Sequence, residues 1–241
     1  MNESEASPAS PAKLALVGYG NMGRLIERLA PDFGFEVALK LDEFNNIDGE
    51  GITAENFQGI DVAVDFSIPS VVAENAEKIA PLGVNLVIGT TGWLDQLPRV
   101  EAALERDKIG VVHGANFSVG VLAFYGIVAA AARILADQDD YDCWAYEAHH
   151  NKKKDAPSGT MLRLLQVMKD NGYPGDPDVA TNRVGAMPGM HEIGFDSEAD
   201  TIRLSHTARS RMGFARGALR AARWVIGKQG LYEFSSIWKQ V

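Results

Sequence analysis

The sequence is poor in cysteine and in long apolar runs. Cys143 is the single cysteine among 241 residues, so no internal disulfide can form, and we expect a reducing compartment. The longest nearly unbroken apolar run covers residues 119–132, whereas a helix that spans a bilayer needs about 20 apolar residues. The opening residues carry acids, serine and proline but neither a basic start nor an apolar segment. These absences argue against a disulfide-rich secreted domain and predict a cytoplasmic protein that contacts no membrane.

Basic side chains are also in deficit. Lys and Arg number 23 against 32 Asp and Glu, a formal net charge of −9. Because such a chain repels polyanions, we expect no nucleic-acid partner. No group of cysteine and histidine residues has the spacing of a zinc site, so we also expect no metal. Hydrophobic residues at 46% and charged residues at 23% are ordinary for a globular protein and exclude a wholly disordered chain.

Short β-branched runs alternate with helical patterns through the first half of the chain. The spacing predicts strands at 14–18, 35–42, 61–67, 85–91 and 109–114, separated by helices at 24–30, 70–80 and 97–106. Strands separated by helices imply parallel βαβ units, and continuously apolar strands imply burial on both faces. The predicted class is therefore α/β, with a doubly wound, Rossmann-like parallel sheet.

The pattern changes after Asn116. A long apolar helix (121–135) precedes an alternating strand (142–150), a helix (158–169), a segment rich in Gly and Pro (172–197) and a second alternating strand (201–208). Alternation is typical of a half-buried mixed sheet, which predicts a smaller α+β domain. A helix (214–226) and an apolar stretch (231–238) end the chain. The predicted divisions are a loose tail (1–12), a dinucleotide-binding domain (13–117), a substrate domain (118–212) and a C-terminal return onto the first domain (213–241).

The first chemical motif is the glycine turn GYGNMG, which follows a predicted strand and opens a helix. In G-x-G-x-x-G the first glycine permits a tight turn, the second lets a pyrophosphate approach the backbone, and the third lets helix and strand pack closely. The helix N-terminus adds free N–H groups for phosphate. Asp42 lies 24 residues beyond Gly18, near the ~20 expected of a carboxylate that binds the adenosine ribose. The predicted cofactor contacts here are Gly18, Tyr19, Gly20, Asn21, Met22, Gly23 and Asp42.

Two further loops follow strands at the edge where open sheets bind ligands. The predicted contacts are Gly89, Thr90, Thr91, Gly114, Ala115, Asn116 and Phe117. Asp42 is followed by Glu43 rather than by a basic residue, which favours NADH over NADPH, although Lys40 tempers this preference. NADPH stays an alternative cofactor, and each loop taken alone is a commonplace turn.

The second motif is EAHHNKKKDAPSGT, residues 147–160. His149 and His150 end a predicted strand, where neighbours point to opposite faces, so they do not easily share a metal. Three lysines follow and form a local positive patch suited to a small anionic substrate. Ser158 is a candidate helix cap, and the N–H groups around Gly159 and Thr160 suit a carboxylate. Each feature has a plainer interpretation, as a solvated surface, a structural histidine or a simple cap, but their combination on one loop favours chemistry.

These segments resemble the dihydrodipicolinate reductase family of bacterial lysine and diaminopimelate biosynthesis. EAHHNKKKDAPSGT is similar to that family's signature, and the likeness extends through VGYGNMG, VDFS, GTTGW, GANFSVGV and SHTARSRMGFARGALRAARW. The resemblance implies reduction of 4-hydroxy-tetrahydrodipicolinate to tetrahydrodipicolinate with loss of water, and a homotetramer built by the substrate domain. It implies that His149 is the catalytic acid/base and Lys153 a second proton donor. His150, Ser158, Gly159 and Thr160 would bind the substrate's carboxylates, and Arg211 would lie at the domain junction.

The sequence departs from the better-known family pattern at the glycine turn, which is one residue shorter and lacks an arginine, and at Glu43, where some members have arginine. Both changes remove cations that would meet a 2′-phosphate. Two other functions stay open from the residues alone. One is a different nicotinamide enzyme on the same scaffold, such as an amino-acid or imine dehydrogenase, which would not need the second motif. The other is a nucleotide-sensing binding protein without catalysis, which would not need its acid–base pair.

Overall fold

The structure is a computed structural model that describes residues 10–241. The chain divides into two compact units, one formed by the residues up to Phe117 together with Phe214–Val241, the other by Ser118–Gly213. The predicted tail of residues 1–12 falls largely outside the described residues. Its last residue is an exception and a correction, because Ala12 already opens the first strand and its backbone N–H donates to the Gly34 carbonyl at 3.0 Å.

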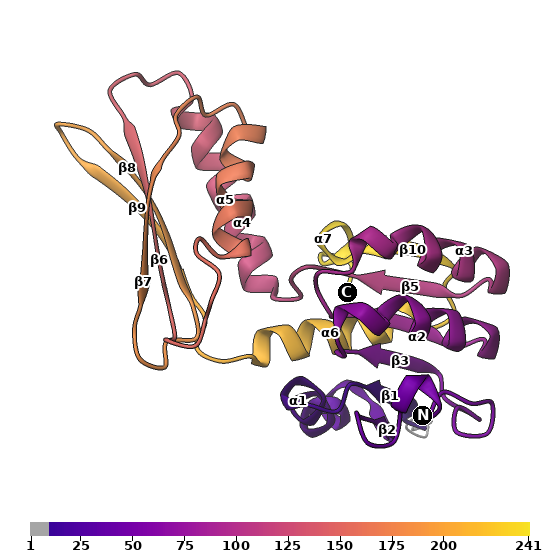
Figure 1. Cartoon of the computed structure of the whole chain (residues 1–241). Coiled ribbons are helices and arrows are strands. Elements are labelled where there is room, and N and C mark those ends of the chain that lie inside the picture. The colour runs from indigo at the N-terminus through magenta and orange to yellow at the C-terminus, as the bar shows by residue number, and fades with distance from the viewer. Residues whose placement is uncertain (1–9) are drawn as a thin grey trace, which may run out of the picture. The chain divides into compact units, whose positions relative to one another are not determined.

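The first unit is built on six parallel strands in the order β10-β5-β4-β3-β1-β2 (Figure 1). The strands are β1 (Ala12–Val17), β2 (Phe35–Leu41), β3 (Val62–Asp65), β4 (Asn85–Ile88), β5 (Gly110–His113) and β10 (Gly230–Glu233). From β1 the chain adds β2 on one side and β3 on the other, so the strand order reverses at β1. Open α/β sheets bind ligands outside the carboxyl ends of their strands at such a reversal. The predicted doubly wound sheet is confirmed.

The helices of this unit cover both faces of the sheet. They are α1 (Asn21–Leu29), α2 (Val72–Ile79), α3 (Leu97–Asp107), α6 (Met212–Val225) and the short α7 (Phe234–Ile237), with 3₁₀ turns at Ala30–Phe33, Ile47–Gly49, Pro69–Val71, Ala80–Leu82 and Leu94–Gln96. One core cluster joins α2 and α3 to the strands through Ala76, Ile79, Val100, Leu86 and Val111. The helix predicted at 24–30 begins three residues earlier than expected, because the turn residues 21–23 already form its first turn.

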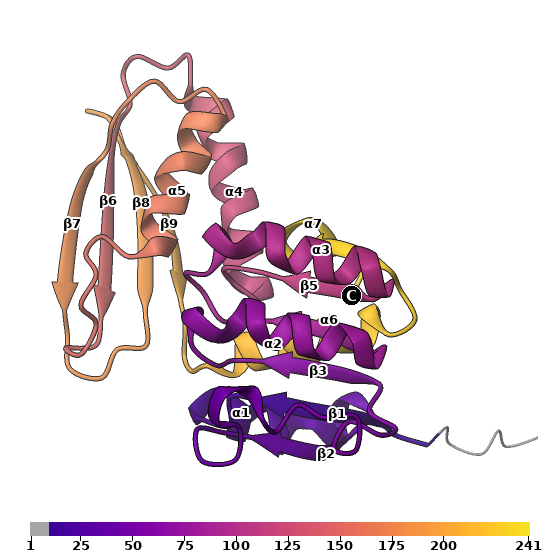
Figure 2. The same cartoon turned by 45° about the vertical axis from the view of Figure 1, so that its right-hand side comes forward.

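The second unit is a four-stranded mixed sheet in the order β7-β6-β8-β9 with two helices on one face (Figure 2). Its elements are α4 (Val119–Leu135), β6 (Asp142–His149), α5 (Gly159–Asp170), β7 (Asp178–Arg183), β8 (Met190–Asp196) and β9 (Thr201–Thr207). β6 runs parallel to β7 and antiparallel to β8, and β8 runs antiparallel to β9. The core lies between sheet and helices and includes Phe124, Met161, Leu164, Ile193 and Phe195. The predicted α+β domain with a mixed sheet is confirmed.

Two strands of this unit were not predicted. The Gly- and Pro-rich segment 172–197 contains all of β7 and all of β8. β7 reads DVATNR, which is too polar to predict a strand. It forms because all six of its residues pair with β6, from Trp144 to His149. β8 is buried at five consecutive positions, so its sequence shows no alternation of apolar and polar residues.

Among the described residues, no helix combines the length and the apolar character needed to cross a bilayer. The apolar run at 119–132 lies inside α4, as predicted for a helix within the protein. Cys143 is buried, and no other cysteine exists to pair with it.

Candidate active site

The glycine turn lies at the carboxyl end of β1, where the strand order of the sheet reverses. Gly18 has φ +87°, and a Cβ there would lie 2.5 Å from the backbone carbon of Phe66, so only glycine fits between β1 and the chain that leaves β3. By contrast, nothing lies within 4 Å of a Cβ placed on Gly20. The backbone at Gly20 is therefore open to a ligand directly before the N-terminus of α1. This geometry fits a dinucleotide pyrophosphate.

Asp42 follows β2, and its carboxylate is engaged in a local turn. Its Oδ1 accepts hydrogen bonds from the backbone N–H groups of Phe44 (2.9 Å) and Asn45 (3.2 Å). These two N–H groups fix the orientation of the carboxylate through Oδ1, and Oδ2 can accept a hydrogen bond from a hydroxyl. The position and the acceptor suit the predicted contact with a ribose.

Asp65, at the end of β3, organises the loops around the turn and was missed by sequence reasoning. It is completely buried. Its Oδ1 accepts from the Ser67 N–H (2.8 Å) and hydroxyl (2.6 Å) and from the Thr90 hydroxyl (3.0 Å), and its Oδ2 accepts from Asn75 Nδ2 (2.8 Å). Burial raises the pKa of Asp65, while these hydrogen bonds act in the opposite direction. The side chain thus fixes Thr90, a predicted cofactor contact, to the end of the neighbouring strand. The sequence signal that could have identified Asp65 is its place as the acidic residue at the end of the otherwise apolar strand VAVD.

The loop after β5 carries the remaining predicted cofactor contacts, Gly114 to Phe117. Phe117 is buried, and its ring lies 4.6 Å from the Phe234 ring, centroid to centroid. A Cβ on Gly217 of α6 would lie 1.8 Å from the Phe117 carbonyl oxygen, so α6 supports this loop only because residue 217 is glycine. α6 therefore contributes to the shape of the loop that carries the predicted cofactor contacts Gly114 to Phe117.

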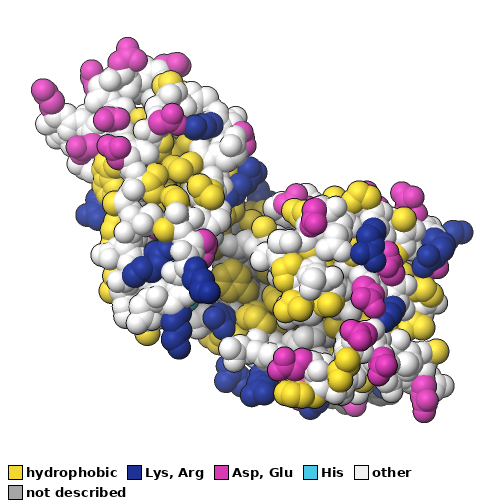
Figure 3. Space-filling view, in the orientation of Figure 1, with side chains coloured by type: hydrophobic (Ala, Val, Ile, Leu, Met, Phe, Trp, Pro, Cys, Tyr) yellow, Lys and Arg dark blue, Asp and Glu magenta, His cyan; other side chains and the backbone are white. Residues whose placement is uncertain are grey.

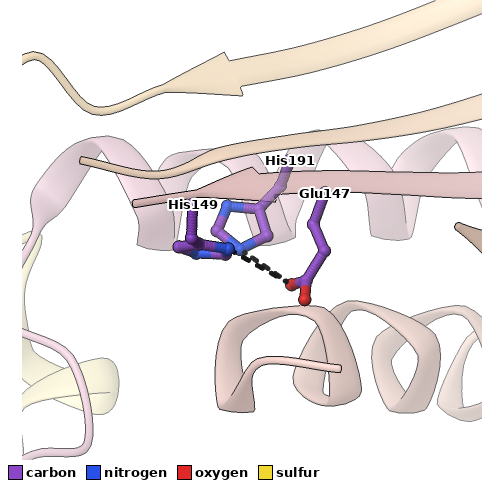
Figure 4. A group of neighbouring side chains, drawn as sticks. All are labelled: Glu147, His149 and His191. Carbon is purple, nitrogen blue, oxygen red and sulfur yellow. Dashed lines mark ion pairs between the residues drawn. The ribbon is translucent and has the colours of Figure 1, made fainter. Parts of the chain in front are cut away.

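In the second unit, a buried cluster of three side chains gathers around the start of α5 (Figure 4). Glu147 and His149 come from β6 and His191 from β8. Glu147 is fully buried, and its two carboxylate oxygens accept the Ser158 N–H at 3.0 and 3.1 Å. The Ser158 hydroxyl accepts the Met161 N–H at 3.1 Å and lies 3.0 Å from His191 Nε2. The cluster thus holds Ser158 through both its backbone and its side chain, and the prediction that Ser158 caps α5 is confirmed.

Burial of the cluster shifts the pKa of both imidazoles downward, which favours their neutral form. Burial lowers the pKa of His191 to about 3, so its neutral Nε2 can accept a hydrogen bond from the Ser158 hydroxyl. Burial also lowers the pKa of His149, with Glu147 opposing that shift and Lys153 and Arg183 adding to it. His149 Nδ1 lies 3.9 Å from Glu147 Oε2 and has no hydrogen-bond partner among the described residues. The imidazole of His149 therefore retains an unused nitrogen next to a buried carboxylate.

The loop between β6 and α5 carries the predicted lysines. Lys153 Nζ lies 2.9 and 2.8 Å from the two carboxylate oxygens of Asp155. Arg183 of β7 braces this loop, because its guanidinium donates to the carbonyls of Lys153 and Asp155. Figure 3 shows Lys and Arg side chains gathered at the end of this unit where β6 and β7 end, with acidic side chains gathered at the opposite end. The local positive field that the sequence predicts for an anionic substrate is present at this end.

The same three buried side chains are the one group in the described part of the chain whose ligand atoms converge as a metal site would require. Glu147, His149 and His191 each offer one atom, and these atoms lie within 4.8 Å of one another. Their environment favours a different role. Ser158 already engages Glu147 and His191, and the cationic Lys153 and Arg183 are close enough to oppose a positive charge on His149. We assign the cluster to positioning the loop, and the expectation of no metal stays a prediction.

The structure thus brings the predicted site residues together within each unit. The second unit holds six of them between the end of β6 and the first turn of α5: His149, His150, Lys153, Ser158, Gly159 and Thr160. The predicted nucleotide contacts follow the strand ends of the first unit. Arg211 is exposed and directly precedes α6. Sequence reasoning assigned no role to Asp65, Glu147, Arg183 or His191. Glu147 and His191 meet only because β6 and β8 pair, with Glu147 opposite His191.

Comparison with known proteins agrees with this geometry. Models of the N-terminus and the C-terminus of dihydrodipicolinate reductase match residues 12–117 and 120–237. The chain belongs to the dihydrodipicolinate reductase family. It is 32% identical over 235 residues to 4-hydroxy-tetrahydrodipicolinate reductase of Christiangramia forsetii, covering 93% of this chain and 96% of that protein. It is 33% identical over 269 residues to the enzyme of the same name from Neisseria meningitidis serogroup B, covering 95% and 97%.

A solved structure shows the same fold. Dipicolinate-bound dihydrodipicolinate reductase from Paenisporosarcina sp. TG-14 superposes with a TM-score of 0.76 at 22% identity, over 94% of this chain and 99% of that one. Membership of the dihydrodipicolinate reductase family makes the protein an oxidoreductase with an NAD(P)-binding Rossmann domain. It is consistent with a place in lysine or diaminopimelate biosynthesis.

Proposed function

We propose that the protein reduces 4-hydroxy-tetrahydrodipicolinate to tetrahydrodipicolinate with loss of water. The observation that carries the proposal is the loop 149–160, where a buried imidazole, a lysine and the capped N-terminus of α5 lie together. A cyclic dicarboxylate needs cations and N–H donors at its carboxylates and a proton source near its ring. When bound, the nicotinamide cofactor supplies a hydride to the ring carbon. The rest of the chemistry falls to the residues of this loop.

The roles within the loop follow from its contacts. The N–H groups of Gly159 and Thr160 open α5 and face no intrahelical acceptor, so they suit a carboxylate, and His150 adds a polar side chain. His149 has an unused nitrogen, and its lowered pKa would rise when a dianionic substrate arrives, because nearby negative charge favours the imidazolium. Lys153 would exchange its partner Asp155 for the substrate. We propose that the proton for the reduced ring comes from His149 or Lys153.

The residues of the first unit support binding of a dinucleotide. The open backbone at Gly20, the N-terminus of α1 and the carboxylate of Asp42 fit a pyrophosphate and an adenosine ribose. We propose the contacts named for this unit, Gly18 to Gly23, Asp42, Gly89 to Thr91 and Gly114 to Phe117, as the nucleotide site. Asp42 and Glu43 bring two carboxylates to the place where NADPH carries its 2′-phosphate, which supports NADH as the preferred cofactor.

The reaction itself is tested with the aldol product of pyruvate and aspartate semialdehyde as substrate. We expect NADH absorbance to fall in step with substrate consumption. Tight NADH binding without any turnover of this imine would instead support a nucleotide-sensing protein. Turnover of other imines or amino acids, with none of this dicarboxylate, would support a different dehydrogenase on the same scaffold.

The cofactor preference is tested by comparing initial rates with NADH and NADPH at equal concentrations well below saturation. We expect a higher rate with NADH, because a carboxylate pair beside the ribose repels a phosphate that carries about −2 charge. Repeating the comparison at high salt is expected to narrow the difference, since the repulsion is screened. A large advantage for NADPH would show the inference from Asp42 and Glu43 to be wrong.

We further propose a homotetramer assembled through the second unit. The sheet face away from α4 and α5 carries a hollow of about 560 Å³ lined in part by Trp144, Tyr146, Met190 and Arg203. Arg203 also pairs there with the buried carboxylate of Glu192 and lies over the Trp144 ring. Aromatic and arginine side chains are enriched in such positions at interfaces.

A further inference from the structure

A cluster of three polar side chains connects the glycine turn with the strand that leads to Asp42. Tyr19 belongs to the turn, Glu27 to α1 and Lys40 to β2. The carboxylate of Glu27 accepts a hydrogen bond from the Tyr19 hydroxyl and lies 3.0 Å from Lys40 Nζ. Lys40 Nζ also lies 5.3 Å from the centroid of the Tyr19 ring. The ammonium of Lys40 is therefore held against the turn by a carboxylate and an aromatic face.

The cluster borders the proposed ribose site. Alternate residues of a strand point to the same face, so Lys40 shares a face with the position of Asp42 two residues later. The Leu41 carbonyl between them accepts the N–H groups of both Gly18 and Tyr19 at 2.9 Å. Lys40 is thus a cation that the strand places beside both the glycine turn and Asp42. Arg24 of α1 also lies near the turn, with its guanidinium carbon 5.8 Å from the centroid of the Tyr19 ring, but Lys40 is the cation that Glu27 pairs with.

The charge state of the cluster decides what this cation can do. Hydrogen bonds from Tyr19 and Lys40 hold the pKa of Glu27 below its usual value, and Glu27 raises the pKa of Lys40. Both groups are consequently charged at neutral pH, and the negative charge of Glu27 offsets the positive charge of Lys40. A 2′-phosphate would have to compete with Glu27 for Lys40 and would meet the charge of Glu27 itself. NADH lacks the 2′-phosphate, so the pairing of Glu27 with Lys40 does not weaken its binding.

We propose that Glu27 is a cofactor-specificity residue that disfavours NADPH by neutralising Lys40. The inference rests on the proposed preference for NADH. It adds to the determinants of that preference a residue of α1, which lies outside both the glycine turn and the end of β2. Without Glu27, Lys40 is a free cation next to the ribose site, and lysine binds phosphate as a point charge.

The test is the Glu27→Gln variant, in which the amide oxygen can still accept the Tyr19 hydroxyl while the charge is gone. Dissociation constants of NADH and NADPH are measured by fluorescence titration, so the readout does not depend on turnover. We expect NADPH to bind about tenfold more tightly than to the wild type, since one charge–phosphate interaction near a surface contributes roughly that much. NADH affinity is expected to change less than about threefold, and the gain for NADPH should shrink with added salt.

Two controls assign the effect. Glu36→Gln removes one carboxylate charge from β2, the strand that carries Lys40. Glu36 lies six residues before Asp42 and therefore about 20 Å away along the strand, so this variant should leave the NADPH dissociation constant unchanged. The double variant Glu27→Gln/Lys40→Gln should lose the gain, because the freed ammonium is absent. A gain that persists in the double variant, or NADPH affinity unchanged in Glu27→Gln, overturns the proposal. If the wild type binds neither nucleotide, the proposed function fails instead, which is a separate outcome.

Discussion

Replacing His149 with Ala is expected to lower turnover about 10²–10⁴-fold, the usual contribution of a positioned general acid. His149 is the one described side chain of the loop with both an unused ring nitrogen and a buried carboxylate beside it. The measurement is the rate of NADH oxidation at saturating substrate. NADH affinity should stay at the wild-type value, because the proposed nucleotide contacts belong to the other unit.

The His149 variant needs a control for folding, since the imidazole is buried. Thermal unfolding of the Ala variant, and of His149→Gln, which retains more of the side-chain volume, distinguishes lost chemistry from lost structure. Turnover that equals the wild type in a folded variant would refute the assignment. Lys153→Ala, compared with Lys152→Ala at the exposed neighbouring lysine, indicates which group delivers the proton. If Lys153→Ala lowers turnover as much as His149→Ala does, Lys153 is favoured as the proton donor. If Lys153→Ala raises KM alone, Lys153 binds the substrate without delivering the proton.

Replacing Asp65 with Ala is expected to lower the free energy of unfolding by about 3 kcal/mol. The variant leaves the buried side chains of Asn75 and Thr90 without their acceptor, and the half-buried Ser67 as well. Each unsatisfied buried group costs about 1–3 kcal/mol. Because Thr90 then loses its attachment to β3, NADH affinity is expected to fall as well. Chemical denaturation and NADH titration measure the two effects.

A matched control is Asp61→Ala. Asp61 accepts a hydrogen bond from the Lys13 N–H at 2.7 Å but lies exposed directly before β3. Its removal should therefore cost less than about 1 kcal/mol and leave NADH affinity unchanged. Asp65→Asn retains an acceptor oxygen and is expected to recover part of the loss. Wild-type stability in the Asp65→Ala variant would show that the hydrogen bonds to Thr90 and Asn75 contribute nothing net.

Much of the first unit was predictable because its signals are local. The turn GYGNMG lies directly after an apolar strand, and the alternation of strands and helices predicts a parallel sheet with its ligand edge at the carboxyl ends. The predicted cap at Ser158 is similarly local, since a hydroxyl that accepts an N–H three residues later needs no distant partner. The start of α1 and the strand β7 were missed, because turn residues can continue a helix and a polar strand shows no pattern of its own.

By itself, the sequence determined the fold class, the glycine turn and the loop that carries the acid–base residues, since each depends on spacing along a few consecutive positions. Only the tertiary structure decided which side chains hold those features in place. Asp65 meets Thr90 across 25 residues and Ser158 meets His191 across 33, through pairings of strands. The pairing of β1 with β2 likewise brings Lys40 beside the turn that Glu27 follows. Burial shifts the pKa of Asp65 and His191, and mutual hydrogen bonds shift those of Glu27 and Lys40. These environments exist only after the strands have come together.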